Sequence, residues 1–209
     1  MRGSGPNRPA RPDVTFKVCL AGDSGVGKTS LVRRFVTSTF DGQYVRTLGT
    51  KVSSKHFVID DPDWPGSQVT VGVTVWDIMG EPGLRELLKE AYFSNMGALL
   101  LVADGTRFDT VYLLEEWHNA VRSVSGDVAT VVLFNKSDVA AVDRVQTAAA
   151  DVCAPLNFPW LLTSAKTGEN VEQAFRLLSQ RYIAKTRSDR KKDDVSAKRL
   201  PMSSMGQAV

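Results

Sequence analysis

The chain has 209 residues, of which 43% are hydrophobic, and a formal net charge of +3. These values fit one globular domain, and no apolar run reaches the roughly 20 residues that a membrane-spanning helix needs. Both ends are basic while the residues between them are net acidic, which argues against nucleic-acid binding by the central part, and the first residues lack the apolar run of a secretory signal.

Hydrophobic periodicity predicts alternating strands and helices. Strands are predicted over 16–21, 51–59, 68–76, 98–103, 129–134 and 159–162, and helices over 30–36, 84–92, 110–124, 141–152 and 171–183. A turn rich in Asp, Pro and Gly over 60–67 joins two strands into an antiparallel hairpin. The fold class is therefore α/β, a three-layer doubly wound arrangement around a mostly parallel six-stranded sheet with one antiparallel edge strand. Trp64 in the turn either anchors a partner or folds back on the sheet.

Composition divides the chain into three segments. We expect a flexible basic leader over 1–13, a folded domain over 14–184 and a polar, charged and disordered tail over 185–209. The tail has no cysteine for a prenyl anchor, so we expect at most weak membrane contact. Cys19 falls in a predicted core strand and Cys153 at the end of a predicted helix, and both are interpreted as small buried apolar residues, which suits a cytoplasmic protein.

The stretch from Gly22 to Thr29 has the spacing of a phosphate-binding P-loop, with two glycines around four residues and then Lys-Thr. Glycine lets the backbone approach a phosphate closely, and a helix N-terminus adds its positive end. Lys28 is a charge that can reach the β- and γ-phosphates, and Thr29 offers a hydroxyl to Mg²⁺. A predicted strand precedes the loop and a predicted helix follows it, which is the context that this chemistry requires.

Polar residues also follow other predicted strands, at the sheet edge where ligands bind. Asp138, four residues after the strand over 129–134, offers a carboxylate to N1–H and the 2-amino group of guanine, two donors that adenine lacks. Asp77 follows another strand as an acidic partner for Mg²⁺, and Thr47 offers a further hydroxyl for the metal. Residues 163–166 stand at the mouth of the same site.

Taken together, these motifs resemble the Ras superfamily of small GTPases, and the Rab and Ras-like branches most closely. The resemblance covers residues 14–184. It rests on the P-loop, Thr47, the Trp76-Asp77…Gly80 stretch and two further motifs, Asn135-Lys136-Ser137-Asp138 and Ser164-Ala165-Lys166, in this order and spacing.

The resemblance implies a small G domain that binds GTP or GDP with Mg²⁺. Nucleotide contacts would come from Ser24, Gly25, Val26, Gly27, Lys28, Thr29, Ser30, Phe40, Thr47, Asn135, Lys136, Asp138, Ser164, Ala165 and Lys166. Phe40 would pack on the guanine, and the Ala165 N–H would meet its O6. Metal contacts would come from Thr29, Thr47 and Asp77, and the catalytic residues would be Lys28, Thr47, Gly80 and Glu81.

The resemblance also implies partners: an exchange factor, a GTPase-activating protein and effectors that contact switch loops around 40–50 and 77–95. We expect a monomer. One departure from the family pattern is Glu81, which stands where the family usually has glutamine. An ionised carboxylate only accepts hydrogen bonds, so we expect slow intrinsic hydrolysis.

Three functions are compatible with these residues. The first is a GTP-dependent switch with slow hydrolysis. The second is an ATP-dependent phosphotransferase, which shares the P-loop but gives no reason for Asn135-Lys136-Ser137-Asp138. The third is an adaptor that holds GTP without hydrolysing it, which Glu81 keeps open.

Overall fold

A computed structural model describes residues 11–41, 50–78 and 90–198, except for the side chains of 78 and 195–198. The described strands are β1 (Val14–Ala21), β2 (Thr50–Asp60), β3 (Gln68–Ile78), β4 (Ala98–Asp104), β5 (Ala129–Asn135) and β6 (Trp160–Thr163). The described helices are α1 (Lys28–Thr37), α3 (Asp109–Tyr112), α4 (Leu114–Ser125), α5 (Val142–Leu156) and α6 (Val171–Lys198). Of the helix predicted over 84–92, residues 84–89 lie outside the described part.

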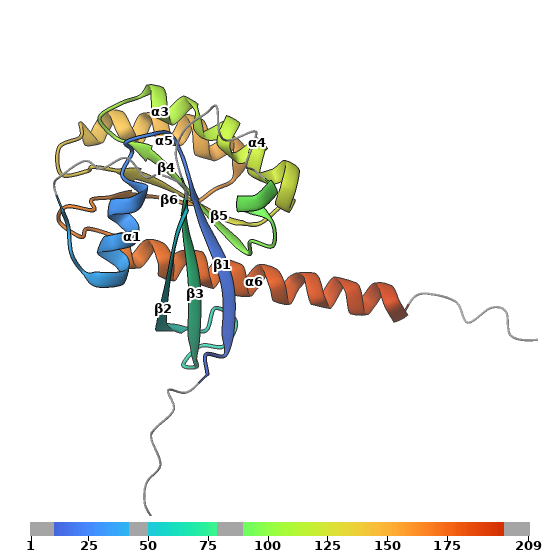
Figure 1. The fold of residues 1–209 in the computed structure, drawn as a ribbon. Helices are drawn as coiled ribbons and strands as arrows, with labels where there is room; N and C mark the ends of the chain where they lie inside the picture. Colours follow the sequence, from blue (N-terminus) through green and yellow to red (C-terminus); the bar gives the residue numbers. More distant parts are fainter. Residues whose placement is uncertain (1–10, 42–49, 79–89, 199–209) are drawn as a thin grey trace, which may run out of the picture.

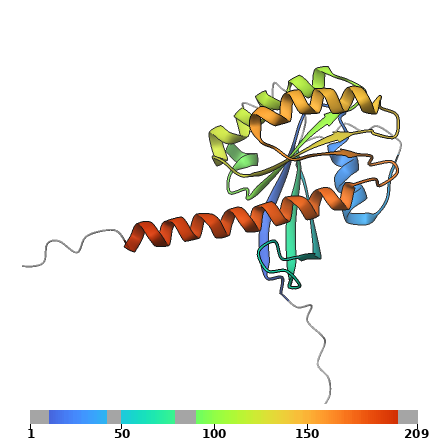
Figure 2. The same ribbon diagram turned by 180° about the vertical axis from the view of Figure 1, so that it is seen from behind.

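The strands form one sheet in the order β2-β3-β1-β4-β5-β6. Neighbouring strands in this sheet run parallel, except that the edge strand β2 is antiparallel to β3. Helices cover both faces, with α1 and α6 on one side and α3, α4 and α5 on the other (Figures 1 and 2). The predicted three-layer doubly wound sheet with one antiparallel edge is confirmed.

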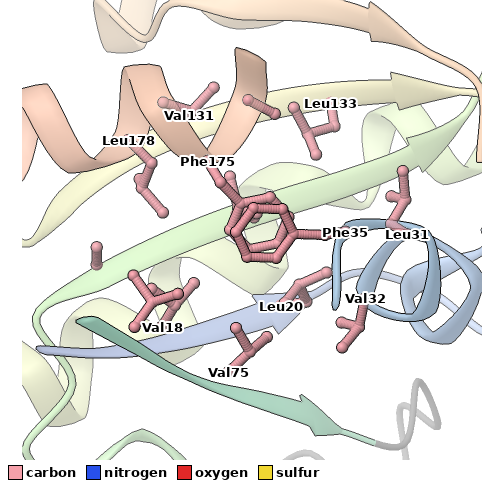
Figure 3. Packing of buried hydrophobic residues seen from close by; sticks show 14 of the residues in the cluster. Val18, Leu20, Leu31, Val32, Phe35, Val75, Val131, Leu133, Phe175 and Leu178 are labelled. Carbon is pink, nitrogen blue, oxygen red and sulfur yellow. The ribbon is translucent and has the colours of Figure 1, made fainter. Parts of the chain in front are cut away.

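Alternate residues of the central strands feed two separate cores. In β1, Val18 and Leu20 belong to the core under α1 and α6, whereas Cys19 and Ala21 belong to the core under α4 and α5. Strands buried on both faces read as continuous apolar runs, which is why their positions could be predicted. Figure 3 shows Phe35 of α1 lying flat against Phe175 of α6, with ring centroids 3.6 Å apart. This contact fixes the helix that follows the P-loop.

The prediction of a disordered tail from residue 185 is wrong over 185–198, because α6 continues to Lys198. This stretch contains no glycine or proline, so nothing local ends the helix. Figure 1 shows the far end of α6 extending beyond the sheet. Within the described residues, no helix, α6 included, is both long and apolar enough to cross a bilayer.

A clamp from Arg187 holds α6 against the turn of the β2–β3 hairpin. Its guanidinium donates to both carboxylate oxygens of Asp61, at 2.6 and 2.8 Å, and to Asp63 at 2.7 Å. The same group lies over the Trp64 ring, 4.5 Å from its centroid. Trp64 therefore contacts α6 through Arg187, and 58% of it stays exposed.

We predict that Arg187→Ala lowers the urea midpoint of unfolding, because it removes these hydrogen bonds and the cation–π contact. Arg190→Ala, an exposed arginine three residues further along α6, is the matched control.

Hydrogen bonds from Arg187 lower the pKa of Asp61 from 3.8 to about 2. The stabilisation that Asp61 contributes is therefore present above pH 3.8 and is lost as the pH falls towards 2. If the difference in free energy of unfolding between wild type and Asp61→Asn stays constant across this pH range, the clamp is contradicted.

Candidate functional site

The P-loop lies between β1 and α1, at the carboxyl edge of the sheet, and its conformation depends on glycine. Gly27, immediately before α1, has φ +100°, and a Cβ there would lie 2.2 Å from Nδ2 of Asn135. Gly22 has φ +147°, and a Cβ there would lie 2.1 Å from the carbonyl oxygen of Val102. The loop can therefore pack against β4 and β5 only without these side chains.

Lys28 is a buried cation at the start of α1. Its Nζ donates to the carbonyl oxygens of Gly22 at 2.8 Å and Asp23 at 2.9 Å, both in the P-loop. Burial lowers the pKa of Lys28 to about 8, against the opposing effect of Asp77 and Asp23. A buried ammonium in a loop of backbone amides at a helix N-terminus is suited to an anion such as a phosphate.

Asp77 lies inside β3, not in the loop that was predicted to follow Trp76. The strand is longer because its pairing with β2 continues through Lys51↔Asp77 to Thr50↔Ile78. Only 1% of Asp77 is exposed, and neither carboxylate oxygen has a hydrogen-bond partner among the described residues. Burial raises the pKa of this carboxyl, although the Thr29 hydroxyl and Lys28 are near enough to oppose the rise.

A buried carboxylate beside the hydroxyl of Thr29 suits a divalent cation, whose charge would compensate the burial of the anion. Oxygen ligands of this kind are those that Mg²⁺ prefers. The third predicted metal ligand, Thr47, lies outside the described residues, as do Gly80 and Glu81.

Asn135 joins the P-loop to the loop after β6. Its Nδ2 donates to the Val26 carbonyl at 2.9 Å, and its Oδ1 accepts from the Ala165 N–H at 3.1 Å. The side chain lies at the end of β5 and only 2% of the residue is exposed. Two loops more than a hundred residues apart are therefore held by a single amide.

The loops after β5 and β6 meet beside this amide. Asp138 Oδ1 accepts from the Ser164 hydroxyl at 2.7 Å, and Lys166 Nζ lies 3.7 Å from the other oxygen. Ser164 also accepts from the Thr167 N–H at 3.1 Å, which closes the turn. The structure thus brings the two predicted guanine loops together at the P-loop edge of the sheet.

The remaining predicted residues are less closely tied to this centre. Ser30 lies in the first turn of α1, partly buried. Phe40 follows α1 and is 39% exposed. Gly25, with φ +74°, lies in the P-loop turn beside Ser24. Lys136 adopts a left-handed conformation, with φ +68°, and its side chain pairs with Asp104 rather than with the P-loop.

Three residues near the site were missed by the sequence analysis. Arg34 of α1 donates to the carbonyl oxygens of Ala165, at 2.8 Å, and Lys166. Asp104 and Arg107 lie at the carboxyl end of β4, where Arg107 donates to the Ser24 carbonyl at 2.8 Å. A signal existed for Asp104, because it directly follows the predicted strand over 98–103 at the edge where ligands bind.

We predict that Asn135→Ala destabilises the fold by about 2–4 kcal/mol, because it leaves a buried carbonyl and a buried N–H unpaired. Urea unfolding measures this loss. Asn119→Ala, on the exposed side of α4, is the matched control. A loss no greater than that of the control would mean that the two loops do not depend on this amide.

Comparison with known proteins matches residues 17–184 to the Ras family. The chain is 32% identical over 182 residues to Ras-related protein Rab-7b of Bos taurus, covering 85% of this chain and 87% of the relative. It is 32% identical over 170 residues to GTP-binding protein ypt1 of Schizosaccharomyces pombe, covering 80% of each. It is 34% identical over 189 residues to human Ras-related protein Rab-26, covering 85% of this chain and 71% of the relative. The chain belongs to the Ras family of small GTPases and lies in its Rab-like branch.

Proposed function

We propose that this chain is a molecular switch that binds GTP and GDP with Mg²⁺ and hydrolyses GTP to GDP and phosphate. The observation that carries the proposal is the junction at Asn135, where the P-loop and both guanine loops meet. Family membership supports GTP binding and GTPase activity in general. An ATP-dependent phosphotransferase would need the P-loop but not the loop that carries Asp138.

The phosphates would lie against the P-loop amides and the N-terminus of α1. Lys28 would then donate to phosphate oxygens instead of the carbonyl oxygens of Gly22 and Asp23. Thr29 and Asp77 would hold Mg²⁺, which neutralises charge on the β- and γ-phosphates. The Asp77 carboxylate would then gain the cation that its burial requires. Thr47 and Gly80 would respond to the γ-phosphate, as the family resemblance implies.

Guanine would lie between the loops after β5 and β6. The Asp138 carboxylate would accept from N1–H and the 2-amino group, while its bond to Ser164 holds it in place. The Ala165 N–H would face O6 of the base. Adenine lacks both of these donors and would leave the Asp138 carboxylate without a partner on the base. Adenine nucleotides should therefore bind far more weakly.

An exchange factor, a GTPase-activating protein and effectors would act through the segments around 40–50 and 77–95. We also propose that the protein acts as a monomer in the cytoplasm, with no role in nucleic-acid binding and at most weak membrane contact. The free, buried cysteines in β1 and α5 support a reducing compartment.

We predict that Asp138→Asn weakens GTP binding and favours xanthosine triphosphate. The amide can donate to the 2-oxo group of xanthine, and its oxygen can still accept from Ser164, so the loop should keep its shape. Competition between the two nucleotides measures the change. Asp151→Asn, exposed on α5, is the matched control. An unchanged guanine preference would mean that Asp138 does not contact the base.

The residue type of Glu81 supports slow hydrolysis and keeps open the second candidate function, a GTP-binding adaptor with little or no turnover. A carboxylate near the γ-phosphate would be repelled or would have to take up a proton, and either outcome weakens the positioning of water.

We predict that single-turnover hydrolysis is faster in Glu81→Gln than in wild type and about equal to wild type in Glu81→Ala. The glutamine amide can donate towards the transferring phosphoryl group, whereas alanine leaves the site as ineffective as the glutamate does. A loss of about tenfold or more in both variants, or about 1.4 kcal/mol of barrier, would show instead that Glu81 is catalytic. Absence of turnover in all three proteins would favour the adaptor.

A further inference from the structure

Asp104, at the end of β4, is a buried carboxylate with four donors around it. Its Oδ1 accepts from the N–H of Thr106 at 2.9 Å and from the Thr106 hydroxyl at 2.7 Å. Its Oδ2 accepts from Lys136 Nζ at 2.6 Å and from Arg107 Nε at 3.2 Å. Only 1% of its side chain is exposed. Both oxygens are therefore saturated, and two cations from different loops share one anion.

The charge on Asp104 is maintained by these donors. Burial acts to raise its pKa, but the hydrogen bonds from Lys136 and Thr106 hold the pKa of this carboxyl below its ordinary value. An ionised acceptor binds its donors more strongly than a neutral one does. The cluster is thus a fixed, charged junction rather than a pair of solvated side chains.

Arg107 extends this junction to the P-loop. While Nε of its guanidinium faces Asp104, Nη2 donates to the carbonyl oxygen of Ser24 at 2.8 Å. The backbone of Arg107 is itself fixed, because its carbonyl accepts from the Thr110 hydroxyl at 2.7 Å. The planar fork of arginine can hold two acceptors at once, which lysine cannot do in the same geometry.

Lys136 needs such support. It adopts φ +68°, a conformation that costs free energy for any residue with a Cβ. Its ion pair with Asp104 holds the side chain in place while the backbone turns from β5 towards Asp138. Loss of Asp104 would therefore release two loops, one through Lys136 and one through Arg107.

We propose that Asp104 and Arg107 are positioning residues that hold the P-loop and the Asn135–Asp138 loop in register, and so set how slowly the bound nucleotide is released. This inference rests on the proposed function. The nucleotide would be gripped by both loops, and it leaves only when they separate. The bond from Arg107, in the β4–α3 loop, to the Ser24 carbonyl restrains the P-loop, and breaking it removes that restraint.

The test is the rate at which N-methylanthraniloyl-GDP is released from the full chain in excess unlabelled GDP. Arg107→Met keeps the apolar stem but removes the donors, and we expect release about tenfold faster than in wild type. Arg107→Lys, which keeps the charge and one direct bond, should release at an intermediate rate. Asp109→Asn, an exposed aspartate in the adjacent short helix, should release as wild type does.

Coupling between the two residues separates positioning from a general loss of stability. Asp104→Asn should also speed release, and the double variant with Arg107→Met should be no faster than the faster single variant, because both act through one junction. If Asp104→Asn does not fold, Arg107→Met and Arg107→Lys can still be compared, because the Arg107 side chain is partly exposed, at 41%. Rescue by lysine is not expected if Arg107 only stabilises the fold.

The outcomes distinguish this inference from the function on which it rests. If wild type does not bind the labelled GDP, the proposed function fails and the inference fails with it. If wild type binds tightly but Arg107→Met releases at the wild-type rate, the inference alone is overturned. Equal acceleration by Arg107→Met and Arg107→Lys, with independent effects in the double variant, would overturn it as well.

Discussion

The hydrogen bonds of one buried amide, Asn135, determine how the candidate site is assembled. Its donor meets the P-loop and its acceptor meets the loop after β6. The amide can reach both because β5 ends beside the P-loop and because Gly27 has no Cβ. A Cβ at that position would collide with the Asn135 Nδ2. A change at either contact would leave buried backbone groups unpaired, which is costly in a low-dielectric interior. The phosphate-binding and base-binding parts are therefore one unit, although they come from distant parts of the chain.

Around this unit, charges compensate one another in pairs. Lys28 and Asp77 are both buried. Burial lowers the pKa of Lys28 and raises the pKa of Asp77, so it disfavours the charged form of each. A phosphate beside the first and a divalent cation beside the second would favour the charged form of each. Asp104 has no such need, because Lys136 and Arg107 already pair with it. Among the described residues near the site, Lys28 and Asp77 are thus buried charges that a charged ligand would compensate further, whereas Asp104 is already paired.

Much of the fold could be predicted from the sequence because its central strands are buried on both faces and its loops have distinctive spacing. The P-loop, Asn135 and Asp138 each carry a local pattern. Asp104 carries only its position after a strand, which is common, and Arg107 carries no pattern, because its contact with Ser24 spans 83 residues of sequence. The extension of α6 was missed because a polar, charged stretch resembles a disordered tail, and its contact from Arg187 to Asp61 spans 126 residues of sequence. Asp77 was expected in a loop because the pairing of β2 with β3 determines where that strand ends.

The most direct test of the account is equilibrium competition among GTP, GDP and ATP for the wild-type protein, together with identification of any nucleotide that co-purifies with it. A site organised around Asn135 and Asp138 should retain a guanine nucleotide and reject ATP by at least about a thousandfold, since adenine offers neither donor to the carboxylate. Binding of ATP with an affinity similar to that of GTP would contradict the account.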